Sequence, residues 1–211
     1  MVESDDMAET SIPKKRGRPG LTEENQQAIQ TAARAILSEA GVDGLRARRL
    51  AERAGVATGS LYKFYPDMDA IIGAVNLDTY RDLTAHLLQA MDACSQPGQL
   101  DRLMTLARAY LGFVSSHGQL WSVLLDYNRG QTGRGEMFVQ AEDVLFGIIE
   151  HELASLPRLE QAHYAPLARA LWASVHGIVL QTLPNSTHAD PVEDTLFQIE
   201  MIVGAVVRDY S

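Results

Sequence analysis

The sequence predicts an all-α protein of about nine helices, in which a small three-helix unit precedes a larger helical body. Three observations predict this fold class. Apolar residues recur at helical spacing from residue 21 almost to the end of the 211-residue chain, and no alternating strand pattern interrupts them. Gly and Pro residues divide that pattern into segments of helix length. The apolar fraction of 46% is large enough to build a substantial core.

The first three predicted helices are separated by residues that end helices. The first begins after Thr22, a favourable capping residue, and ends at Gly41. The second ends at Gly55, and the third ends before Pro66. We therefore expect residues 21–66 to form one compact domain.

The rest of the chain, residues 67–211, is predicted to be a second, larger helical domain. Its helices are expected at 68–93, 99–117, 119–127, 135–155, 160–183 and 192–209. Each break between them contains Gly or Pro, which favour turns over helices.

Residues 1–20 are expected to be disordered, because they are charged, poor in apolar residues and rich in Pro and Gly. The net charge changes sign along the chain: it is −4 over residues 1–13, +5 over 14–65 and −10 over 66–211, which gives −9 in total. A basic segment joined to an acidic body indicates that one part contacts a polyanion and the other does not.

The cellular compartment is suggested by what the sequence lacks. Cys94 is the only cysteine, so the chain can form neither an intramolecular disulfide nor a cysteine-based zinc site. The first twenty residues contain no apolar signal-peptide core. No run approaches the roughly 18 apolar residues of a membrane span. We expect a cytoplasmic protein with no membrane partner.

Sequence patterns that would indicate an enzyme or a metal site are incomplete. His151 and Glu152 could begin a zinc-protease helix, but Ser155 stands where the second His is needed. Glu160 and His163 form one half of a di-iron pattern that requires a second such pair. No nucleotide-binding glycine loop is present. We predict a protein that is not an enzyme, with no catalytic residue, no metal and no cofactor.

Residues 46–65, RARRLAERAGVATGSLYKFY, have the pattern of a helix-turn-helix. The small Ala51 and Ala54 allow the helices to approach closely, and Gly55 can adopt the left-handed backbone that ends the first of them. In such a motif the second helix enters the major groove of DNA with its N-terminal residues at the base edges. A three-helix unit with a solvated basic face would show the same spacing, so the pattern alone leaves both interpretations open.

Residues 22 to about 75 resemble the N-terminal DNA-binding domain of the TetR family of bacterial transcriptional regulators. The resemblance is carried by LAERAGVATGSLYKFYPDMDAI, which combines the LAxxAGV and GSLY blocks with an aromatic pair and a proline before a long helix. It implies that the following residues face DNA: Arg46, Arg48, Thr58, Gly59, Ser60, Tyr62, Lys63 and Phe64. It also implies a homodimeric repressor that leaves a palindromic operator in double-stranded DNA when a small-molecule effector binds.

The sequence departs from the family pattern after Pro66. Relatives often have Ser-Lys-Glu there, with the lysine beside a DNA phosphate, whereas this chain has Asp67, Met68 and Asp69. The two acids would stabilise the N-terminus of the next helix electrostatically. One expected phosphate contact is therefore absent.

A basic stretch at residues 14–19, KKRGRP, resembles the core of AT-hook peptides. Arg16 and Arg18 flank a glycine, and such a pair can lie in a narrow A·T-rich minor groove. A tail that only increases solubility would have the same composition. Beside a helix-turn-helix we expect a minor-groove arm.

The stretch LWASVHGIVLQTL at 171–183 resembles the WHG-type C-terminal domain of some TetR-like regulators. In the family the last two long helices, here 160–183 and 192–209, pair with their copies in a second subunit. The effector pocket is expected among the middle helices. Its candidate residues, each of which could equally belong to the plain core, are Tyr110, Phe113, Trp121, Leu124, Tyr127, Phe138, Trp172 and His176. The alternative function is a helical small-molecule-binding or scaffolding protein that has lost DNA binding.

Overall fold

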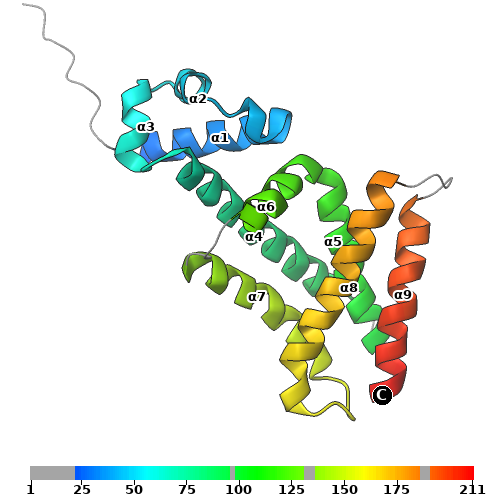
Figure 1. Cartoon of the computed structure of the whole chain (residues 1–211). Coiled ribbons are helices and arrows are strands. Elements are labelled where there is room, and N and C mark those ends of the chain that lie inside the picture. Colours follow the sequence, from blue (N-terminus) through cyan, green and yellow to red (C-terminus); the bar gives the residue numbers. More distant parts are fainter. Residues whose placement is uncertain (1–21, 96–97, 131–135, 186–190) are drawn as a thin grey trace, which may run out of the picture.

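A computed structural model describes residues 22–95, 98–130, 136–185 and 191–211 (Figure 1). These residues form nine α-helices and one 3₁₀ turn, without a β-strand among them, and the all-α prediction is confirmed. The elements are α1 (Glu23–Gly44), α2 (Ala47–Ala54), α3 (Thr58–Phe64), α4 (Met68–Asp92), α5 (Gln99–Ser116), α6 (Gly118–Gly130), α7 (Glu136–Leu153), η1 (Gln161–His163), α8 (Tyr164–Asn185) and α9 (Pro191–Tyr210).

Helices α1, α2 and α3 lie together at one end of the molecule, and we call this unit the head (Figure 1). Side chains of the head pack with the beginning of α4 and with two residues of α6. This head cluster consists of Ile29, Ala32, Ala33, Ile36, Leu37, Leu45, Leu50, Ala51, Leu61, Tyr65, Ile71, Ile72, Val75, Leu120 and Val123. The apolar core of the head thus extends past the domain boundary that we expect at residue 66.

Two glycines shape the head through left-handed backbone conformations. Gly41 has a φ of 60° and kinks α1, so the regular helix ends where the sequence predicts and one further turn follows. Gly55 has a φ of 69° and ends α2, and its N–H bonds to the carbonyls of Ala51 and Glu52. Glycine adopts this conformation at no steric cost. The turn between α2 and α3 therefore depends on Gly55.

Helix α4 connects the head to the rest of the molecule, which we call the body (Figure 1). It is capped by Asp67, whose Oδ1 accepts a hydrogen bond from the Ala70 N–H at 2.7 Å. Near its start, Ile71 and Val75 belong to the head cluster, whereas Leu87, near its end, belongs to the core of the body. A movement of α4 is therefore felt in both cores.

Helix α6 also belongs to both cores, because its two faces point in different directions. Leu120 and Val123 are buried in the head cluster. Trp121 and Leu124, one residue further along in each case, are buried in the core of the body. The head and body are thus joined by two helices, α4 and α6.

The body core is formed by α5, α7, α8 and α9 together with parts of α4 and α6. Arg102 on α5 and Glu152 on α7 form a bidentate ion pair with N–O distances of 2.6 and 2.7 Å. The Glu152 side chain is only 5% exposed, so this pair fixes α5 to α7 near the end of the body.

Helices α8 and α9 pack side by side on the side of the body away from the head (Figure 1). The outer surface of α9 exposes Phe197 (65%), Met201 (60%) and Ile202 (38%). Large apolar side chains at neighbouring positions of one helix form a patch, and such patches mark interaction surfaces. Of the described helices, none is both long and apolar enough to cross a membrane.

Candidate DNA-binding edge and effector cavity

Helix α3 presents a small, polar surface at the outside of the head. Thr58, Gly59, Ser60, Tyr62 and Lys63 form this surface, which we call the recognition edge; Tyr62 is 51% exposed and Ser60 is partly buried. The helix is anchored from below by Leu61, which is completely buried in the head cluster.

No neighbour within the described chain requires a glycine at position 59. A Cβ added there would meet no atom within 4 Å, and the backbone φ of Gly59 is not positive. Internal packing therefore leaves room for a larger side chain at the exposed N-terminal end of α3. A small residue is favoured there only if something outside the chain approaches closely.

The cations of the head divide into paired and unpaired groups. Arg53 donates two hydrogen bonds to the Glu39 carboxylate, at 2.6 and 2.7 Å, and Arg49 lies 3.6 Å from the same carboxylate. The hydrogen bonds from Arg53 hold the pKa of Glu39 below its usual value. Within the described residues, the exposed Arg46, Arg48 and Lys63 form no ion pair.

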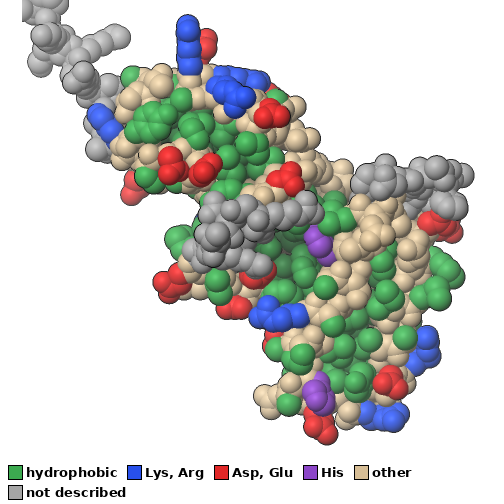
Figure 2. Space-filling view, in the orientation of Figure 1, with side chains coloured by type: hydrophobic (Ala, Val, Ile, Leu, Met, Phe, Trp, Pro, Cys, Tyr) green, Lys and Arg blue, Asp and Glu red, His purple; other side chains and the backbone are tan. Residues whose placement is uncertain are grey.

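These three unpaired cations are among the residues that the family resemblance assigns to DNA. Lys and Arg side chains are visible over the head in Figure 2. Phe64, also assigned to DNA, is partly buried and packs against the head cluster, so it supports the edge from inside. Arg16 and Arg18 of the predicted arm lie outside the described residues.

The start of α4 differs from the family pattern in structure as well as in sequence. Asp67 caps the helix, as described above, and its position explains why an acid is favourable there. Met68 is half-buried and packs against the head cluster. A side chain at position 68 therefore runs along the head surface before it reaches solvent.

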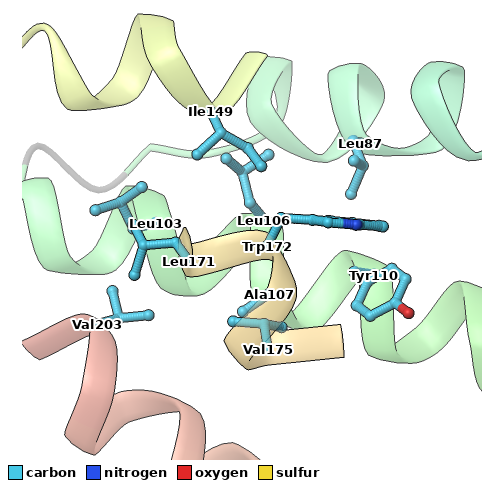
Figure 3. Close-up of a pocket in the computed structure, with 10 residues that line it drawn as sticks. All are labelled: Leu87, Leu103, Leu106, Ala107, Tyr110, Ile149, Leu171, Trp172, Val175 and Val203. Carbon is cyan, nitrogen blue, oxygen red and sulfur yellow. The ribbon is translucent and has the colours of Figure 1, made fainter. Parts of the chain in front are cut away.

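A cavity of about 50 Å³ lies inside the body (Figure 3). Its wall is contributed by α4, α5, α7, α8 and α9. The lining residues are Leu87, Leu103, Leu106, Ala107, Tyr110, Ile149, Leu171, Trp172, Val175 and Val203. None of them is charged, and Figure 3 shows the Tyr110 hydroxyl pointing away from the apolar side chains. The interior of this cavity is therefore almost entirely apolar.

Aromatic residues connect the cavity to α6. The Tyr110 hydroxyl and His176 Nδ1 share a hydrogen bond of 2.5 Å, and the His176 ring is stacked on Trp172 with an interplanar angle of 9°. The ring of Trp121, on α6, meets the Tyr110 ring edge-on at a centroid distance of 5.7 Å. Burial raises the pKa of Tyr110 well above its usual value, so its hydroxyl stays protonated at neutral pH.

The structure brings together only part of the predicted pocket. Tyr110 and Trp172 line the cavity, and His176 adjoins it through Tyr110. Three other candidates, Phe113, Trp121 and Leu124, are buried in the body core but do not line the cavity. Tyr127 packs against the head cluster, and burial together with Asp69 and Asp67 raises its pKa. The side chain of Phe138 lies outside the described residues.

Most of the cavity wall consists of aliphatic residues that the sequence does not distinguish from other core positions. The pattern of apolar residues places Leu103, Leu106 and Ala107 on the buried face of α5. It contains no signal that these residues border a space and that Leu111, on the same helix, does not.

A second apolar depression lies on the surface between α4 and α7, with a volume of about 360 Å³. We call it the α4–α7 groove, and it is lined by Leu77, Arg81, Thr84, Ala85, Leu88, Met137, Gln140, Ala141 and Val144. Unlike the cavity, it contains a cation, although Arg81 is paired with Asp78 at 3.1 Å.

A helix-turn-helix head joined to a helical body that contains an apolar cavity defines the class of one-component, ligand-responsive regulators. Residues 29–75 match the family model described as bacterial regulatory proteins of the tetR family, and residues 103–202 match the tetracyclin repressor-like C-terminal domain. The chain belongs to the TetR family of bacterial transcriptional regulators.

Curated relatives are HTH-type transcriptional regulators. YxbF of Bacillus subtilis, itself uncharacterized, is 29% identical over 171 residues, which is 81% of this chain and 43% of that protein. Rv1816 of Mycobacterium tuberculosis is 24% identical over 107 residues, which is 51% of this chain and 46% of that protein. The chain thus spans less than half the length of the curated relatives that it matches.

Solved structures share the fold at low sequence identity. A protein of unknown function from Rhodococcus sp. RHA1 has a TM-score of 0.74 at 21% identity, covering 92% of this chain and 99% of that one. A TetR-family regulator from Streptomyces coelicolor has a TM-score of 0.65 at 16% identity, with 89% and 99% covered. The regulator FadR from Bacillus subtilis, solved with stearoyl-CoA, has a TM-score of 0.65 at 14% identity, with 84% and 97% covered.

Proposed function

We propose that this protein is a cytoplasmic, non-enzymatic repressor that binds a palindromic DNA operator and leaves it when a small molecule enters the body cavity. The observation that carries the proposal is the recognition edge. Its outer residues are small, and the cations Arg46, Arg48 and Lys63 have no acidic partner among the described residues. Unpaired cations beside a small surface suit the approach of a phosphate backbone and a major groove.

The proposed repressor is a homodimer formed through α8 and α9. The exposed Phe197, Met201 and Ile202 give α9 an apolar outer surface that a second copy would bury. A twofold dimer presents two copies of α3 about one DNA turn apart, or a little more, and so requires an operator with inverted half-sites.

The proposed coupling from cavity to head runs through α4 and α6. The cavity volume of about 50 Å³ is far below the roughly 300–1,000 Å³ of typical ligand pockets, so an effector must push the walls apart. Leu87 places α4 directly in that wall, and Tyr110 transmits a displacement to Trp121 on α6. Both helices end in the head cluster. A differential affinity of only about 1–3 kcal/mol would change DNA binding by 5–150-fold.

Selection from a random duplex library tests the proposal. The folded chain should enrich an inverted repeat, whereas Gly59→Leu should not, because the added side chain would stand between α3 and the DNA. Gly147→Leu is the matched control: position 147 is also an exposed helical glycine with no atom within 4 Å of an added Cβ, but it lies on α7. If the folded wild type enriches no sequence at low salt, the proposal fails and the helical ligand-binding alternative is favoured.

A further inference from the structure

We infer that the body cavity selects a small, electrically neutral, apolar molecule and rejects acids, bases and phosphorylated ligands. This inference rests on the proposed function, because it assigns a ligand class to the effector cavity of the proposed repressor. It is carried by the composition of the wall and by the engagement of every charged group that the structure places near it.

The wall supplies no group that could hold an ion. Nine of the ten lining side chains are hydrocarbon or indole, and the remaining one, Tyr110, directs its hydroxyl away from the cavity toward His176 (Figure 3). Transfer of an ion from water into such a site, without a partner, is strongly disfavoured. Binding must therefore come from burial of apolar surface and from contact with the rings of Tyr110 and Trp172.

The cations closest to the cavity are already engaged. Arg102 precedes a lining residue, Leu103, but its Nε and Nη2 groups both donate to Glu152, which is itself buried. Arg169 lies over the Phe146 ring at 4.3 Å and is 3.8 Å from Asp143. A ligand carboxylate would have to displace one of these acids. A ligand amine would enter a wall with no acidic group at all.

The size of the space sets an upper limit on the ligand. A dry apolar cavity of about 150 Å³ accommodates benzene, and this cavity measures about 50 Å³ before it widens. A single-ring hydrocarbon is therefore the natural probe, because it requires the smallest displacement of the walls that still gives a measurable apolar contact.

Three probes of nearly the same shape test the inference: cumene, benzoate and benzamidinium. They attach an isopropyl group, a carboxylate or an amidinium to one benzene ring, so charge is the main difference between them. Binding to the full chain is measured by titration calorimetry and by the fluorescence of Trp172. Cumene should bind and raise the thermal midpoint. Benzoate and benzamidinium should bind about 100-fold more weakly or not at all.

Two variants locate the bound probe. Ala107→Leu fills the cavity, and Ala141→Leu is the matched control because it makes the same change in the α4–α7 groove. Circular dichroism verifies that both remain helical. Ala107→Leu should lose cumene binding, whereas Ala141→Leu should retain it.

Three results would overturn the inference: benzoate or benzamidinium binds as tightly as cumene, none of the probes binds, or Ala141→Leu is the variant that loses cumene. A separate titration of the operator complex distinguishes this failure from failure of the proposed function. If cumene binds in the cavity without changing DNA affinity, the ligand class stands and the repressor mechanism fails.

Discussion

Substitution of Gly73 by alanine tests how closely α6 packs against α4 at the head. An added Cβ would lie 2.8 Å from Tyr127 Oη and 3.4 Å from Tyr127 Cζ. The oxygen contact is roughly 0.6 Å shorter than an ordinary van der Waals contact, whereas the carbon contact is close to normal. Because the tyrosine ring is rigid, α6 must shift or the ring must leave its rotamer, at a cost of about 1–3 kcal/mol.

Alanine also has a better helix propensity than glycine, worth about 0.5–1 kcal/mol within a helix. The net effect of Gly73→Ala should therefore be a loss of about 1 kcal/mol in the free energy of unfolding, from the difference of these two terms. When Tyr127→Phe removes the oxygen, the same substitution should instead stabilise the protein by about 0.5–1 kcal/mol. The sign of the effect thus reverses between the two backgrounds.

Urea unfolding of the four proteins in this cycle, at one fixed protomer concentration, measures the coupling between positions 73 and 127. We expect a coupling energy of about 1–3 kcal/mol. If Gly73→Ala changes the free energy equally in both backgrounds, Tyr127 does not pack against α4 at this glycine, and α6 is not held to the head as described.

Three further predictions concern the head, the body and the start of α4. Gly55→Ala should lower the free energy of unfolding by about 1 kcal/mol through backbone strain alone, since φ is 69° and the space is open, while Gly59→Ala should leave it nearly unchanged; equal losses in urea would contradict this. Arg102→Ala should cost about 3 kcal/mol because it leaves the buried Glu152 unpaired, and Glu152→Ala should cost less because Arg102 is a third exposed; thermal unfolding would refute this if the order were reversed. Met68→Lys should tighten DNA binding at all sequences, because the stem retains the packing and the ammonium reaches a phosphate; unchanged affinity in a filter-binding assay would place position 68 away from the DNA.

Most of the fold follows from local rules that the sequence displays. The breaks at Gly41, Gly55 and Pro66 are backbone properties of single residues, and the structure has a kink or a helix end at each. The start of the fourth long helix of the body differs. A helix was expected from residue 160, but a 3₁₀ turn occupies 161–163 and α8 begins at Tyr164. Helix ends depend on tertiary packing, which periodicity does not report.

The candidate site was less accessible to sequence reasoning. Arg48 and Arg49 are adjacent in the sequence and equally basic, yet only Arg49 lies near Glu39, a residue of α1 that folding brings beside α2. The cavity posed the same difficulty. Aromatic residues drew attention, but Phe113 and Trp121 fill the core, whereas the plain aliphatic Leu87 places α4 in the cavity wall. Both distinctions depend on contacts between helices that are distant in the sequence.

The salt dependence of operator affinity is the most direct test of the central claim that the recognition edge binds DNA. The dissociation constant is measured by fluorescence anisotropy over a range of salt concentrations for the wild type, Lys63→Ala and Arg108→Ala. Arg108 is an exposed cation of α5 in the body, so its removal changes the net charge equally. Lys63→Ala should reduce the log–log slope by about 0.9, the value for one phosphate contact, and Arg108→Ala should leave it unchanged. An unchanged slope for Lys63→Ala, or the same reduction in both variants, would contradict the claim.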